Sequence, residues 1–177
     1  MTPDEIVANF LAALDNFEPI TDQPSDFDLT RLRGAIAPLL LQIPYDETGG
    51  THNLIGIIWE KPAYLKRYGE AFPKPTRVGA YDLEFDDDAT AVVWTRLKAA
   101  HMARRADRAT YDTARWETTQ FVLAFVADTY VRELRDPETI YTEVDPRDLL
   151  ARLHAECTVR HALDLLALHN KMQRYHL

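Results

Sequence analysis

The chain has 177 residues and a formal net charge of −8, with 28 acidic against 20 basic residues. This excess of acidic residues argues against a domain whose whole surface binds nucleic acid. The single cysteine, Cys157, excludes an internal disulfide framework and fits a reducing, cytoplasmic compartment. No apolar run approaches the roughly 18 residues of a membrane span, and the size is that of one domain, residues 1–177.

Two helices are expected before residue 44. The first begins at Thr2, because a capping hydroxyl is followed by proline at the first helical position and by Glu5 three residues on. The second begins at Ser25, with Asp28 in the corresponding place. Pro38 is expected to kink or end this second helix, since it lacks the amide hydrogen and crowds the preceding turn.

Residues 44–80 form an irregular insert that holds most of the six glycines and several prolines. Within it, the apolar run 54–59 reads as a short strand or a short buried helix, and a hairpin about residues 46–50 also fits. A short helix follows from Glu60, with Tyr64, Leu65 and Tyr68 facing inward and Gly69 as its stop.

The remainder is predicted to be helical with one loop. A helix over 89–106 continues to about Leu134, and its broad apolar face marks it as a central buried helix. Residues 136–144 form a loop, Pro146 opens the next helix, and a break near Thr158 separates a last helix over 159–173. The fold class is therefore all-α, a compact bundle of about six or seven helices.

Two clusters raise the question of a metal site. His154, Cys157 and His161 share one face of an unbroken helix and are zinc-binding types, but a fourth ligand is missing, so packing is the favoured interpretation. The acids at 84 and 86–88 do not follow the spacing of a calcium loop, and negative charge before a helix is favourable in itself. We therefore predict no metal and no cofactor.

The densest basic stretch includes Arg104, Arg105 and Arg108. A solvated face paired to nearby acids is favoured over weak contact with RNA, because these side chains spread around the helix. No phosphate-binding loop, nucleophile elbow or zinc-protease motif is present. The chain is therefore predicted not to be an enzyme.

The order of residues in the insert resembles a motif of copia-type retrotransposon Gag proteins. The matching residues are Gly49, Gly50, His52, Leu54, Gly56, Ile58, Tyr64, Phe72, Pro75 and Gly79. Residues 141–150, followed by Leu153 and Cys157, and the ending over 166–176 are similar to later segments of that family. The resemblance covers about residues 20–177, with departures at Asn53 and Asp145, where glycine and threonine are usual.

The resemblance implies a structural role, that of the N-terminal capsid-like region of a Gag protein. Such a protein self-associates into virus-like particles around the RNA of its element. The RNA would be bound mainly through a downstream region. The residues expected at contacts between copies are Ile55, Ile57, Ile58, Trp59, Tyr64 and Tyr68. That the insert only seals one end of the bundle stays equally open. Two other functions also stay open: a host-retained module that binds a protein partner, and a small enzyme using His154, Cys157 and His161.

Overall fold

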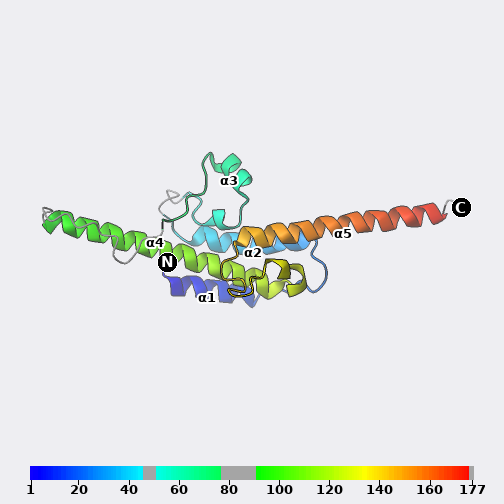
Figure 1. The fold of residues 1–177 in the computed structure, drawn as a ribbon, viewed down its shortest axis with the longest axis horizontal. Helices are drawn as coiled ribbons and strands as arrows, with labels where there is room; N and C mark the ends of the chain where they lie inside the picture. Colours follow the sequence, from blue (N-terminus) through cyan, green and yellow to red (C-terminus); the bar gives the residue numbers. More distant parts are fainter. Residues whose placement is uncertain (46–50, 77–90, 176–177) are drawn as a thin grey trace.

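A computed structural model describes residues 1–45, 51–76 and 91–175, and the described chain is all-α, with no strand (Figure 1). Its α-helices are α1 (Pro3–Leu14), α2 (Asp26–Gln42), α3 (Lys61–Tyr68), α4 (Ala91–Phe125) and α5 (Pro146–Tyr175). Short 3-10 turns are η2 (Ile55–Ile57), η3 (Asp128–Tyr130) and η4 (Arg132–Leu134). The predicted fold class is confirmed, with five α-helices in these residues rather than six or seven.

The body of the molecule is a bundle of four helices. α1 packs on α4, α2 packs on α5, and both pairs contact each other (Figure 1). The core contains an edge-to-face contact between Phe10 of α1 and Phe121 of α4, whose ring centroids are 6.2 Å apart. Other fully buried residues are Ile6, Leu32, Ile36, Leu40, Val122, Leu149 and Leu153.

Both predicted helix starts in the first part of the chain are confirmed. At Thr2 and Ser25 the side chain accepts a hydrogen bond from the backbone amide three residues on, and the acid there accepts one from the capping amide. Pro38 does not end α2, which continues to Gln42. The helix keeps its face of buried residues on both sides of the proline, and this packing outweighs the lost hydrogen bond.

The long helices differ from the prediction at two points. α4 ends at Phe125 and not near Leu134, because the chain turns there and the amide of Ile20 donates to the Phe125 carbonyl. α5 is continuous through Thr158, whose hydroxyl donates to the His154 carbonyl instead of capping a new helix. The predicted break is therefore wrong. Residues 77–90, with the acidic cluster, lie outside the described residues.

The insert forms a buried 3-10 turn followed by α3. The run 54–59 takes the helical alternative as η2, and α3 ends at Gly69, as predicted, in the left-handed conformation with φ of 80°. The hairpin predicted about residues 46–50 lies outside the described residues. Leu65, expected to face inward, is exposed, while Tyr64 is buried.

Two helical extensions project from the body. Figure 1 shows the first half of α4 and the second half of α5 running far past the other helices, in opposite directions. We call residues 91–106 the α4 arm and residues 159–172 the α5 arm. Among the described residues, no helix combines the length and apolar character that a bilayer crossing requires.

Candidate self-association surface

The contact surface predicted on the insert is not available in the structure. Ile55, Ile57, Ile58 and Tyr64 are buried in the core, and Trp59 is only partly exposed. Tyr68, the last predicted contact residue, is also packed partly against the core. Four of the six predicted contact residues are thus buried in the single chain, which favours the alternative that the insert seals one end of the bundle.

Specific hydrogen bonds hold the insert on the body. The amide of Leu54 donates to the Leu40 carbonyl of α2 at 3.3 Å. The guanidinium of Arg147, at the start of α5, donates to the carbonyl of Gly56, with the Nε atom at 2.9 Å. Within the insert, the Tyr45 hydroxyl donates to the Pro73 carbonyl at 3.0 Å. These bonds satisfy backbone groups that the irregular segment would otherwise bury without partners.

A buried histidine and tyrosine form the polar centre of the insert. The Tyr64 hydroxyl and Nδ1 of His52 are 2.7 Å apart, and the ring of Tyr68 lies 4.1 Å from the imidazole. Burial, followed by the charges of Tyr68 and Glu70, raises the pKa of Tyr64 to about 12. Since His52 is only 4% exposed, a substrate has no access to this pair, and the contact orders the core.

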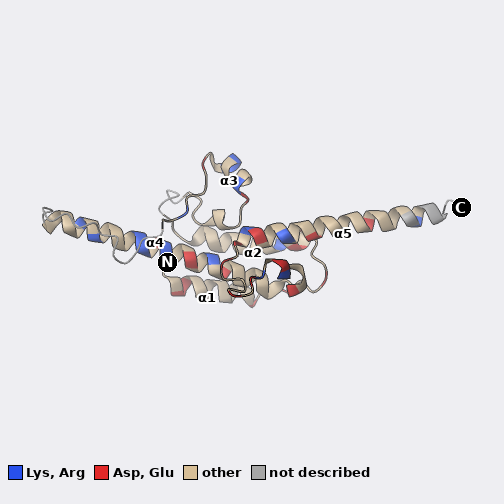
Figure 2. Ribbon diagram, in the orientation of Figure 1, with Lys and Arg blue, Asp and Glu red and all other residues tan. Residues whose placement is uncertain are grey.

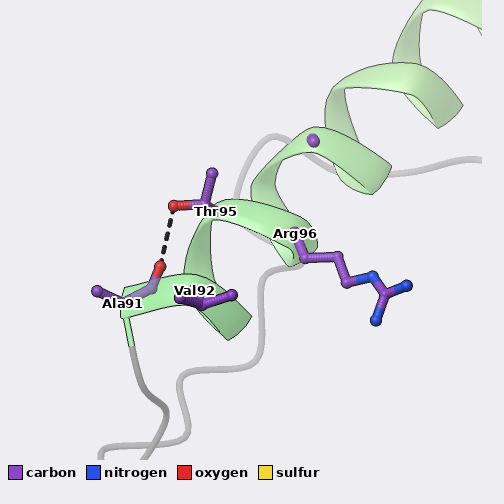
Figure 3. A pocket seen from close by; sticks show the side chains of 5 residues that line it. Ala91, Val92, Thr95 and Arg96 are labelled. Atoms are coloured by element: carbon purple, nitrogen blue, oxygen red, sulfur yellow. Dashed lines mark hydrogen bonds between the residues drawn. The ribbon is translucent and has the colours of Figure 1, made fainter.

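The described surface includes two hollows with defined linings. One, of about 520 Å³, lies between α2 and α3 and carries Arg33, Trp59 and Glu60 on its walls. The other, of about 550 Å³, lies along the start of α4 (Figure 3), where Val92, Thr95 and Arg96 are among the lining residues and Thr95 donates back to the Ala91 carbonyl. Neither set of lining residues contains a nucleophile beside a base, the arrangement that covalent catalysis requires.

The residues of the candidate zinc cluster have different surroundings. Cys157 is buried against the core, whereas His154 and His161 are exposed on α5. Across the described ranges, His, Cys, Asp and Glu side chains form no group of three or more that could hold a metal ion. Packing accounts for Cys157.

The basic residues of α4 divide into two kinds. Arg104 and Arg105 are exposed on the α4 arm, where Figure 2 shows several basic positions in blue. Arg108 instead donates to Asp112 at 2.6 Å and to the Pro75 carbonyl at 2.9 Å. It therefore fastens Pro75 to α4, and its pairing with Asp112 agrees with the favoured interpretation of a basic face paired to nearby acids, rather than with the alternative of RNA contact.

An exposed apolar surface that was not predicted above lies on the α5 arm. Its members are each between 52% and 56% exposed: Val159, Leu163, Leu165, Leu166, Leu168 and Met172. Figure 2 shows this part of α5 mostly in tan, the colour of uncharged residues. The α4 arm adds exposed Val92, Val93, Leu97 and Met102.

The signal for this surface was present in the sequence. A helix exposed on one side keeps polar residues over about half of its circumference. In the α5 arm, apolar residues occupy most of the circumference. Such a helix is normally buried, and here the described body leaves it uncovered. The α5 arm is therefore the candidate site of interaction.

Comparison of the chain with protein-family models, with curated proteins and with solved structures finds no match.

Proposed function

We propose that the protein is a non-enzymatic structural protein, the capsid-like domain of a copia-type Gag, which self-associates into particles that package RNA. The observation that carries the proposal is the apolar surface of the α5 arm. The order of residues that resembles the Gag family supports the same conclusion independently.

Burial of the α5 arm supplies a driving force for association. Full burial of a leucine side chain is worth roughly 1.5–3 kcal/mol, so the half-exposed residues of the arm hold several kcal/mol in reserve. Part of this offsets the loss of translational and rotational freedom on binding. The favourable free energy of burial and the unfavourable loss of freedom together predict a modest, concentration-dependent association of the isolated chain. The association is more stable where several contacts act together.

The opposite directions of the two arms suit an extended assembly. A copy that meets one neighbour through α4 and another through α5 has contacts at both ends of its long axis (Figure 1). Contacts between different surfaces produce rings, filaments or shells, depending on the rotation between copies. A structural protein of a particle needs this property, whereas a simple dimer does not.

The test is sedimentation velocity of the full chain over a wide concentration range. We expect the mean mass to rise with concentration, and the rise to be smaller for the double variant Leu165→Ser/Leu166→Ser, whose changes lie on different sides of the arm. The matched control is Leu11→Ser/Leu41→Ser, because these leucines are exposed to a similar degree on α1 and α2. A chain that stays monomeric at every concentration would overturn the proposal.

The groove between α2 and α3 favours a second candidate function, a host-retained module that binds a protein partner. Its volume of about 520 Å³ is within the range of ligand pockets, and half-buried Trp59 provides an aromatic anchor. Such a module would remain monomeric and would bind through Trp59. Sedimentation thus separates it from the first candidate, and replacing Trp59 by alanine would abolish its partner binding without changing the mass of the free chain.

A further inference from the structure

The face of α5 that is buried in the body becomes charged in the arm. Leu150, Leu153 and Cys157 follow one another at steps of three and four residues, and all are buried. Further steps of three and four residues along the same face reach Asp164 and Lys171, which lie one turn or more beyond the last contact with the body. The arm is therefore not a continuation of the body's core, and its apolar residues face in other directions.

One of these directions forms a regular seam. Leu165, Leu168 and Met172 follow at steps of three and four, and His161 lies one turn before them, so the four share a face of the helix. All four side chains are exposed. This is the spacing with which two helices pack knobs into holes over a short coiled coil.

The charges beside this seam are complementary when the helix meets itself in the opposite direction. Asp164 directly precedes Leu165, and Lys171 directly precedes Met172, so both lie along the same edge. In an antiparallel pair, residues on the same edge face each other across the seam. The register that sets Leu165 against Leu168 of the other copy also sets Asp164 against Lys171, twice by symmetry.

From this register we infer that the α5 arm docks on the α5 arm of a second copy, antiparallel about a two-fold axis between residues 166 and 167. The inference rests on the proposed function, for which it names the contact. In it, Leu165 packs on Leu168 of the other copy, His161 packs on Met172, and each Asp164 pairs with the other copy's Lys171. Val159, Leu163 and Leu166 stay available for further contacts.

The bodies of the two copies do not collide in this arrangement. Cys157, the last buried residue among those whose burial is described in α5, is between nine and ten residues from the axis. At about 1.5 Å per residue, each body therefore begins about 14 Å from the axis, on opposite ends of the paired arms. The geometry leaves room for the arms to meet along their full length.

The α4 arm is the less suitable partner for the same seam. It contains Arg96, Lys98, Arg104 and Arg105, with no acid between residues 91 and 106. The α5 arm has Asp164 as its sole acid, so pairing with α4 would leave most positive charges unmatched. Pairing with a second α5 arm matches Asp164 with Lys171 and leaves only Arg160 of each copy outside these pairs.

The test uses charge reversal in the full chain, with sedimentation velocity at low salt and circular dichroism to check folding. Asp164→Lys and Lys171→Asp should each weaken the association about tenfold or more, because both symmetric ion pairs become repulsive. An equimolar mixture of the two variants should regain the wild-type association. In a mixed pair, each of the two lysines of one variant faces one of the two aspartates of the other. The matched control Lys66→Asp, at an exposed position of α3 outside both arms, should associate as the wild type does.

The outcomes separate this inference from the proposed function. If the wild type associates but both reversals associate equally well, or if the mixture fails to recover, the antiparallel α5 contact is wrong while self-association stands. A wild type that remains monomeric overturns both. If association recovers in the mixture but neither variant associates by itself, a local effect of each substitution on its own helix is not the cause. This result would establish contact between copies.

Discussion

Gly56 is the residue on which the position of the insert depends most closely. A Cβ atom built on it would lie 2.2 Å from atoms of the Phe72 ring, far inside van der Waals contact. The carbonyl of the same residue accepts a hydrogen bond from the guanidinium of Arg147, whose Cζ lies 5.7 Å from the centroid of the Phe72 ring. A single small residue thus lets α5, η2 and the segment after α3 meet.

We expect Gly56→Ala to lower the free energy of unfolding by about 1–3 kcal/mol, the usual cost of overpacking a buried site. Thermal or urea unfolding would measure the change. Gly34→Ala is the matched control, because nothing lies within 4 Å of a Cβ there and the position is inside α2. It should leave stability equal or raise it by up to about 1 kcal/mol. Equal behaviour of the two variants would contradict the packing of Phe72 on Gly56.

Residue-scale predictions from the sequence succeeded where the chemistry is local. The caps at Thr2 and Ser25 and the stop at Gly69 each depend on neighbouring residues within one turn, and all three are present. The exposure of Trp59 and Tyr64 depends instead on parts of the chain that are distant in sequence, such as α2 and the start of α5. Local pattern could not decide that question.

At the scale of elements, the two halves of α5 lie in different surroundings. Its first half is held by the body, and the carbonyl of Glu156 accepts a hydrogen bond from Gln23 of the α1–α2 connection. Beyond that residue the helix continues through Tyr175. An unsupported helix of this length is marginal in water, so the arm gains stability chiefly when it is covered.

This change of support predicts a concentration-dependent pattern of amide hydrogen exchange. At low concentration the amides of the α5 arm should exchange quickly, and at high concentration they should become protected, because association covers them. Mass spectrometry after exchange measures both states. The amides at 149–153 should be slow throughout, and α3, which lies outside the proposed contact, should not change with concentration. Protection that is the same at both concentrations would count against the arm as the contact.

The continuity of α5 was misread from the sequence for a physical reason. Thr158 is a competent capping residue, and the apolar pattern changes phase beside it. A phase change arises from a break in the helix or from a change of partner along an intact helix. The hydroxyl's bond to the His154 carbonyl shows the second case. The same phase change is therefore better interpreted as the border of an interaction surface.

At the scale of the molecule, the arms separate charge as well as apolar surface. The net charge is −8, yet the α4 arm carries only positive side chains among its charged residues. Arg104 and Arg105 are exposed there, while Arg108 is held by Asp112 and the Pro75 carbonyl. The composition alone argued against RNA contact by the whole domain. It could not reveal that several basic residues lie together on a projecting helix.

The α4 arm is therefore expected to bind single-stranded RNA weakly and with strong dependence on salt. If about four phosphates are neutralised, raising salt from about 50 to 200 mM should weaken binding about 50-fold, since each contact contributes roughly 0.7 to the logarithmic slope. Replacing Arg104 and Arg105 by glutamate should reduce this dependence to at most about sevenfold and weaken binding at low salt. Fluorescence anisotropy with a labelled oligonucleotide measures both. The exposed pair Lys66 and Arg67 on α3 offers a control with the same change of charge, which separates contact at the arm from the general effect of net charge. If the two double variants lose affinity equally, the arm has no special role, and RNA responds only to the overall field of the protein.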